Sequence, residues 1–162
     1  MRSDSDPKRE LLRHALATLA YRGGKAMHNA PANFADYRCS ETSRTPEQIL
    51  AHIGDLLDWG LSIARGKQTW RDSGVQNWNQ DVERFFSGLK AFDDFLASDH
   101  PLDAAPEKLL QGPIADALTH VGQIAMLRRM AGAPLKGESY FAAEIIVGRV
   151  GREQAVAMKE FD

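Results

Sequence analysis

Apolar residues recur with the period of an α-helix in four stretches of the chain, and charged residues occupy most positions between them. We expect helices from about residue 7 into the low twenties, from 46 to 65, from 78 to 97 and from about 113 to 131. The third stretch has a strong apolar face, formed by Val82, Phe85, Phe86, Leu89, Phe92 and Leu96. Such spacing gives each helix one side that must be buried against other helices.

The second helix has the clearest start signal. Thr45 is a good N-cap, Pro46 suits the first helical position, and Gln48 completes a capping box. The first helix is weaker, because Gly23-Gly24 interrupts it, although it can resume toward His28.

We place the start of the fourth helix near Gly112-Pro113, because proline is favoured in a first helical turn. Pro106 then falls in the preceding loop. Gly132 and Pro134 follow the last apolar residues and end the helix.

Four amphipathic helices joined by polar loops predict an all-α fold, a four-helix bundle. Residues 1–162 fit a single domain, with core helices within about 7–132 and a short C-terminal extension, 133–162, that covers the bundle. Within the extension, Tyr140–Val147 fits either a strand or a short helix, and we interpret it as a helix or extended cover.

The composition narrows the class of protein. Hydrophobic residues make up 43% of 162 residues, and the net charge is -2, which gives no basic stripe for nucleic acid. The single cysteine, Cys39, excludes an internal disulfide framework and favours a reducing compartment. The N-terminus lacks the apolar core of a secretory signal, and no run reaches the roughly 20 apolar residues of a membrane span. We therefore expect a cytoplasmic protein with no nucleic-acid or membrane partner.

His52, Asp116 and His120 are the candidate metal ligands. Asp116 and His120 are four residues apart, so they lie on one face of their helix. His52 lies on or beside the buried face of the second helix, and ligands on facing helices can project into a bundle together. Two imidazoles and a carboxylate form a three-ligand site with an open position. The alternatives are a hydrogen-bonded core histidine and an aspartate that only interacts favourably with the dipole of its helix near the N-terminus.

Whether the two histidines lie at the same height along the bundle depends on the relative direction of their helices. His52 is six residues past Pro46, and His120 is seven past Pro113, so they lie at matching heights if the two helices are parallel. Antiparallel helices need a stagger, and the sequence leaves both arrangements open.

The remaining histidines and aromatic residues have simpler explanations. His14, His28 and His100 fit surface or capping positions, and Cys39 has no visible partner base, so we treat it as structural. The tryptophans are expected to pack or to line a pocket mouth; they are Trp59, Trp70 and Trp78.

Two segments of the chain resemble one family. His120-Val121-Gly122-Gln123-Ile124, followed by Leu127-Arg128-Arg129, resembles the His-x-Gly-Gln signature in the last bundle helix of DinB/YfiT-like metalloenzymes. Ala51-His52-Ile53, followed by Asp55, Leu56 and Trp59, resembles the family's second-helix histidine. The resemblance covers about residues 7 to 132.

The resemblance implies a four-helix bundle with one crossover connection, a homodimer, and a divalent metal held by the second-helix histidine and a pair in the last helix. It implies zinc or nickel first, and imidazole and carboxylate donors also suit manganese or iron. Members with known activity include S-transferases and an isomerase that use low-molecular-weight thiols. This chain departs from the commonest pattern, because Asp116 replaces the first histidine of the pair. The thiol-dependent isomerases are similar in having an acidic residue there.

Two functional hypotheses follow. The first is a divalent-metal-dependent enzyme, a thiol-dependent S-transferase or isomerase acting on a small molecule. Gln123 and Glu144 are then the candidate catalytic residues, with Tyr140 and Phe141 as walls of the pocket. A solvent-facing or salt-bridged carboxylate is the simpler interpretation of Glu144. The second hypothesis is a non-enzymatic dimeric bundle with a vestigial metal site, which binds a small molecule or a protein partner.

Overall fold

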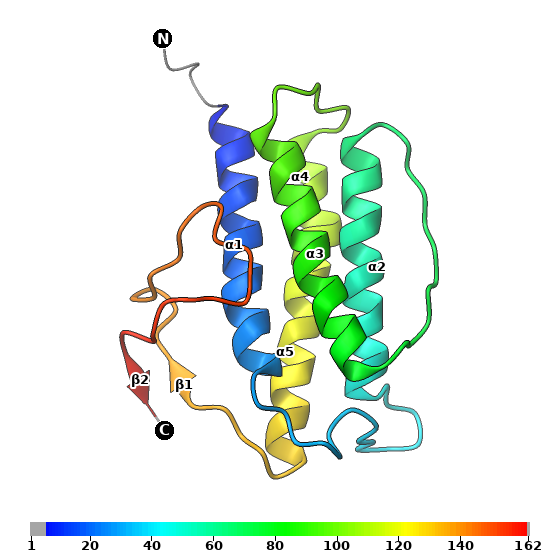
Figure 1. Ribbon diagram of the computed structural model, residues 1–162, viewed down its shortest axis with the longest axis vertical. Coiled ribbons are helices and arrows are strands. Elements are labelled where there is room, and N and C mark those ends of the chain that lie inside the picture. Colours follow the sequence, from blue (N-terminus) through cyan, green and yellow to red (C-terminus); the bar gives the residue numbers. More distant parts are fainter. Residues whose placement is uncertain (1–5, 162) are drawn as a thin grey trace.

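Four long helical segments run along one axis in the structure, a computed structural model in which residues 6–161 are described (Figure 1). The helical elements are α1 (Pro7–Met27), α2 (Pro46–Ala64), α3 (Trp78–Ala97), α4 (Pro106–Leu109), the π-helical η1 (Leu110–Ile114) and α5 (Ala115–Met130). Because α4, η1 and α5 follow one another without a break, they form one long segment. The prediction of an all-α, four-helix arrangement is confirmed at this level.

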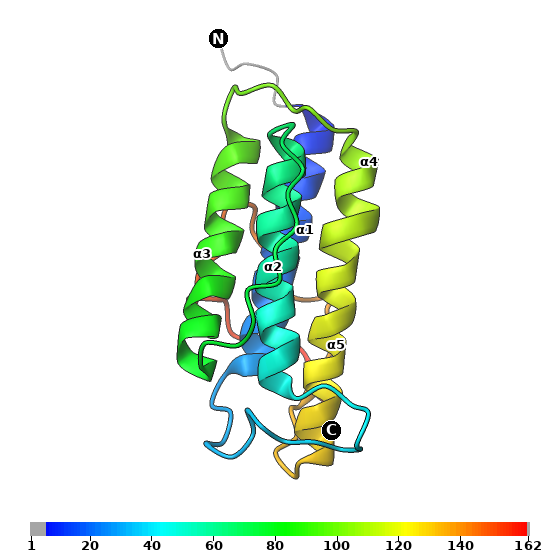
Figure 2. The same cartoon turned by 90° about the vertical axis from the view of Figure 1, so that its right-hand side faces the viewer.

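The helix directions follow from one long connection. The crossover (residues 65–77) descends along the outside of α2, so α2 and α3 run in the same direction (Figure 1, Figure 2). The other two segments run the opposite way. α1 contacts α3 and α5, and α2 contacts the same two helices, so the four segments pack in a square arrangement.

A buried ion pair holds the crossover against α2. The carboxylate of Asp55 is 5% exposed and accepts hydrogen bonds from Arg84 Nη2 at 2.7 Å and from the Ser73 backbone N–H at 3.2 Å. Arg84 also donates to Asp58 at 2.7 Å and to the Ala51 carbonyl at 3.2 Å. One residue of α3 therefore ties α2 and α3 together beneath the crossover.

The predicted capping box of α2 is confirmed. The Gln48 backbone N–H donates to Thr45 Oγ1, and the Thr45 N–H donates to the Gln48 side chain. The first helix, in contrast, continues through Gly23-Gly24 to Met27. A Cβ atom on Gly23 would lie 2.5 Å from Phe85 Cζ, so this glycine permits close contact between α1 and α3.

The fourth segment begins earlier than the sequence pattern predicts. Pro106 takes its first turn, and Pro113, which we expected at its start, lies inside the π-helical η1. A proline has no N–H for the helical ladder, and the π turn accommodates it. The ring of Pro113 also packs on Gly60, where an added Cβ would lie 3.0 Å from Pro113 Cβ. The absence of a side chain at Gly60 thus allows α2 to approach this segment closely.

Arg128 is buried at the other end of the bundle. It donates to the Ala26 carbonyl at 3.0 Å and the His28 carbonyl at 2.9 Å, which lie at the end of α1. It also donates to the Ala133 carbonyl at 2.9 Å. One guanidinium therefore satisfies carbonyls at the ends of two helices.

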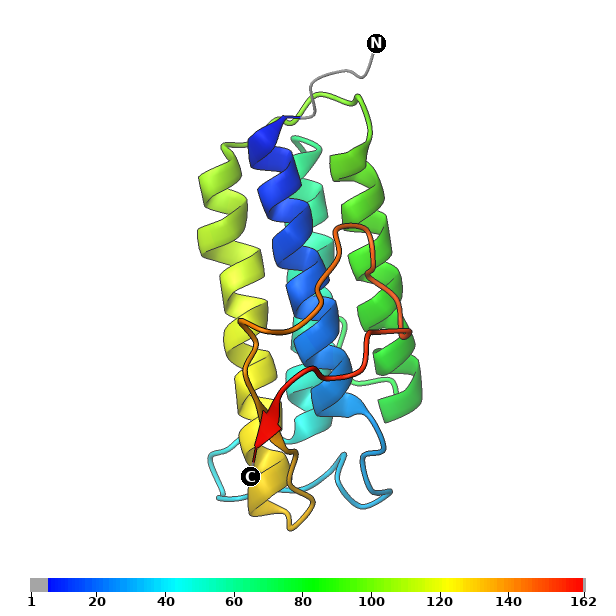
Figure 3. The ribbon, with the colours of Figure 1, turned by 90° about the vertical axis from the view of Figure 1, so that its left-hand side faces the viewer.

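The tail (residues 133–161) crosses the outer face of α1 (Figure 1, Figure 3). It contains the two-residue strands β1 (Gly137–Glu138) and β2 (Glu160–Phe161), which pair antiparallel. The buried carboxylate of Glu138 accepts from Tyr21 Oη and from Lys25 Nζ, both at 2.7 Å. The tail is thus an extended cover, as one of our two interpretations predicted, and it contains no helix in its described part.

Among the helices of residues 6–161, none is both long and apolar enough to cross a membrane.

Candidate metal centre

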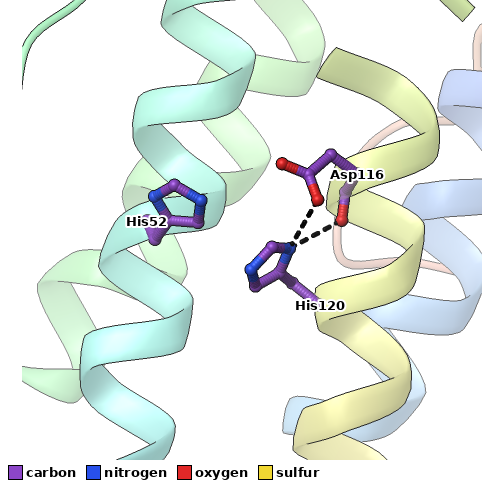
Figure 4. Close-up of side chains that lie close together, drawn as sticks. All are labelled: His52, Asp116 and His120. Atoms are coloured by element: carbon purple, nitrogen blue, oxygen red, sulfur yellow. Dashed lines mark hydrogen bonds and ion pairs between the residues drawn. The ribbon is translucent and has the colours of Figure 1, made fainter. Parts of the chain in front are cut away.

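His52, Asp116 and His120, called the trio below, come together between α2 and α5 (Figure 4). Each residue offers one ligand atom, and these atoms lie within 4.8 Å of one another. The two imidazole centroids are 4.7 Å apart, with 60° between the ring planes. Such a cluster could hold a metal ion, as the sequence predicted.

The trio forms although α2 and α5 are antiparallel. His52 is six residues after the first residue of α2, Pro46, and His120 is ten residues before the last residue of α5, Met130. At this end of the bundle α5 extends beyond the start of α2 (Figure 2), and the two histidines lie opposite each other (Figure 4). The extra length of α5 therefore supplies the stagger that an antiparallel pair requires.

His120 is oriented by its own helix. Its Nδ1 is 2.7 Å from the backbone carbonyl oxygen of Asp116 and 3.2 Å from Asp116 Oδ1. A carbonyl only accepts, so Nδ1 carries the proton and donates to it. The lone pair is consequently on Nε2, and a backbone carbonyl on the other ring nitrogen is a usual support for a metal-binding histidine.

His52 is held by aromatic contacts. The ring of Trp70, from the crossover, meets the His52 ring edge to face at 5.6 Å, and Trp59 meets Trp70 at 5.8 Å. Burial lowers the pKa of His52, and the nearby His120 and Arg44 act in the same direction. Near neutral pH the imidazole is therefore uncharged, which is the form that binds metals.

Asp116 contributes the charged oxygen. The alternative is an aspartate that only interacts with the dipole of its helix. It lies in the first turn of α5, but the helical backbone of α4 and η1 continues before it, ten residues back to Pro106. Its side chain is 45% exposed. The carboxylate is therefore accessible from solvent beside the two more buried imidazoles.

A cleft of about 620 Å³ opens beside the two histidines. Its lining residues are Cys39, Ser43, Arg44, Ile49, His52, His120, Gln123, Met126, Leu127 and Met130. Gln123, predicted as a catalytic residue, is among them, one turn after His120. The volume lies in the range of small-molecule sites.

The structure does not bring Glu144 to this cleft. Its carboxylate is exposed in the tail and lies 3.8 Å from Arg149 Nη1, as the simpler interpretation had it. Tyr140 packs on Tyr21 at 6.2 Å, and Phe141 is fully exposed, so neither lines the cleft. The tail covers α1, whereas the cleft belongs to α2, α5 and the connection that precedes α2.

Several lining residues escaped the sequence analysis. Leu127 and Met130 follow Asp116, His120 and Gln123 at steps of three or four, so one face of α5 carries all five. That periodicity was available as a signal. Arg44 and Cys39 gave none, because their place at the cleft depends on the path of the loop between α1 and α2.

Comparisons of the chain with protein-family models, with curated proteins and with solved structures find no match. The geometry of the trio and of the cleft beside it is therefore what indicates a function.

Proposed function

We propose that the trio binds a divalent metal ion and that the protein is a metal-dependent enzyme of the DinB/YfiT-like type. The convergence of His52, Asp116 and His120 within 4.8 Å carries this proposal. Two imidazole donors and one carboxylate suit zinc or nickel, and also manganese or iron. Three protein ligands leave room for a further ligand, and the adjoining cleft offers it a path.

The reaction class that fits is thiol-dependent transfer or isomerisation of a small molecule. A divalent ion in such a site lowers the pKa of a thiol that reaches it. In the transfer reaction the thiol sulfur forms a bond to an electrophilic carbon, the leaving group departs with its electron pair, and the thiol proton goes to solvent. His120 is held in position by the Asp116 carbonyl, and Gln123 presents an amide that can orient the small molecule.

Metal content tests the site directly. The full chain is purified without an affinity tag, and its metals are measured by elemental analysis. We expect about one divalent ion per chain in the wild type and in His14→Ala, whose histidine is exposed on α1. His52→Ala should lose the ion. Absence of metal from the wild type, or equal metal in both variants, would rule out the trio as its site.

Activity is tested separately. Consumption of low-molecular-weight thiols in the presence of electrophilic acceptors is compared between the metal-loaded wild type and His52→Ala. Turnover by the wild type alone supports the enzyme. A metal-loaded wild type that turns over none of the acceptors, and isomerises none of the thiol adducts, would contradict it.

One observation favours a second candidate, a non-enzymatic bundle that binds a small molecule. No carboxylate lines the cleft within the described residues, and Glu144 lies elsewhere. A site without an acid or base beside the trio is suited to holding a ligand. Stoichiometric metal and ligand binding without turnover would favour this candidate.

A further inference from the structure

We propose that the cleft binds an organic acid, with the carboxylate on Arg44 and an apolar body across α5. The inference deepens the proposed function and rests on it, since this ligand would be the small molecule that the site transforms. Two features of the cleft support it, the charge of Arg44 and an apolar wall.

Arg44 gives the cleft its charge. Of the described lining residues, it is the only lysine, arginine, aspartate or glutamate. Ion pairs in residues 6–161 involve other cations, so Arg44 has no carboxylate partner within the described chain. A guanidinium presents a planar set of donors that matches a carboxylate. Arg84, by comparison, already has two aspartates.

The trio reinforces this electrostatic preference. A divalent ion would bring two positive charges, whereas the trio contains one carboxylate, that of Asp116. The cleft and trio together would therefore remain positive. A concave site of one sign concentrates ligands of the other sign.

The remaining wall is apolar and adaptable. Met126 and Met130 are 64% and 50% exposed, and Leu127 and Ile49 lie beside them in the lining. Methionine side chains are flexible and polarizable, so they adjust to apolar groups of different shape. Exposed methionines in the same cleft as an arginine that has no carboxylate partner in residues 6–161 fit a ligand with one anionic end and one apolar end.

Calorimetry with defined probes tests the charge requirement. Decanoate and phenylbutyrate represent aliphatic and aromatic acids, and decanol is the uncharged comparison. Each is titrated into wild type, Arg44→Gln and Arg129→Gln, whose exposed arginine at the end of α5 is outside the cleft. A charge-assisted hydrogen bond contributes about 1.5–3 kcal/mol. Arg44→Gln should therefore weaken binding of the acids by roughly 10- to 100-fold, with decanol unaffected.

Cys39 gives an independent measurement. It is the only cysteine of the chain, it is exposed, and it lines the cleft. Its reaction with a chromogenic disulfide should slow as either acid saturates the wild type. Met126→Glu, which adds a negative charge at an exposed position, should abolish this protection while circular dichroism shows an intact helical fold.

Each outcome separates the two proposals. Acid binding by metal-free protein that never takes up metal would sustain the ligand assignment and contradict the metal centre. Full metal occupancy with no binding of either acid would support the metal centre and contradict the ligand assignment. The ligand assignment is overturned if decanol binds the wild type as tightly as decanoate, or if Arg44→Gln and Arg129→Gln behave alike.

Discussion

Two polar clusters lie on α2 only three residues apart, and they differ in how completely their groups are paired. Asp55 is buried and accepts from both Arg84 and the Ser73 backbone. Three residues earlier, by contrast, the ring nitrogens of His52 have no hydrogen-bond partner among the described residues. Instead the ring faces His120 and Trp70. A paired cluster stabilises the fold, whereas an incompletely paired one retains capacity for a ligand.

The largest expected effect comes from breaking the paired cluster. Asp55→Ala leaves Arg84 half-paired beneath the crossover, and loss of one partner of a buried pair costs about 3 kcal/mol. Asp58→Ala removes the more exposed partner, at 62% exposure, and should cost less than about 1 kcal/mol. Urea unfolding of metal-free protein measures both free energies. Equal losses would show that Asp55 has no special structural role.

In His52→Ala we expect the opposite: the stability of the metal-free protein changes little, whereas the stabilisation by metal is lost. Metal-free protein should change by about 1 kcal/mol, because only the partly buried ring is lost. Zinc at 100 times its dissociation constant should stabilise the wild type by about 2.7 kcal/mol, since it binds only the folded chain. The variant should lose this gain, whereas His14→Ala should keep it. If zinc still raises the unfolding free energy of His52→Ala, the assignment of His52 as a metal ligand is wrong.

Gly60 sets how closely α2 approaches α3 and η1. In Gly60→Ala the new methyl group would lie 2.8 Å from Phe92 Cε1 and 3.0 Å from Pro113 Cβ. Overpacking typically costs about 1–3 kcal/mol, so we expect net destabilisation and weaker zinc binding as α5 shifts. Gly122→Ala is the matched control, because nothing lies within 4 Å of its Cβ. It should gain roughly 0.5–1 kcal/mol from helix propensity. A higher melting temperature for Gly60→Ala than for Gly122→Ala would refute the explanation that α2 needs a glycine for close contact.

The smallest effect concerns pH. Burial, followed by His120 and Arg44, lowers the pKa of His52 below its ordinary 6.5. The unfolded chain then binds more protons at this residue between the two pKa values, so the unfolding free energy falls as pH drops through 6.5. Metal-free His52→Gln should lose less stability than the wild type between about pH 7.5 and about pH 5. If the unfolding free energies of the wild type and of His52→Gln fall equally over this pH range, His52 is not the source of the pH dependence.

Features that depend on nearby residues could be predicted from the sequence. The capping box at Thr45 and the bounds of α3 follow from neighbouring positions, and both are as expected. Asp116 and His120 share a face for the same local reason. The continuous fourth segment could not be predicted, because Pro113 suits a helix start and a π turn equally well in the sequence.

Features that depend on distant segments were missed. Whether α2 and α5 are parallel was left open, since helix direction depends on the course of the crossover. Glu144 was placed near the chemistry because its segment is apolar, but the contact of Glu138 with Tyr21 and Lys25 fixes the tail on α1. Arg44 reaches the cleft through a loop whose path no periodicity describes.

The spacing of the trio along the chain also determines when the site can form during synthesis. His52 leaves the ribosome well before Asp116 and His120, which follow 64 and 68 residues later. Since α2 packs on both α3 and α5, its contact with α3 can form first as the chain emerges. Until α5 follows, a nascent chain holds one imidazole of the trio and an uncovered apolar face, so we expect it to bind a chaperone before it can bind a metal.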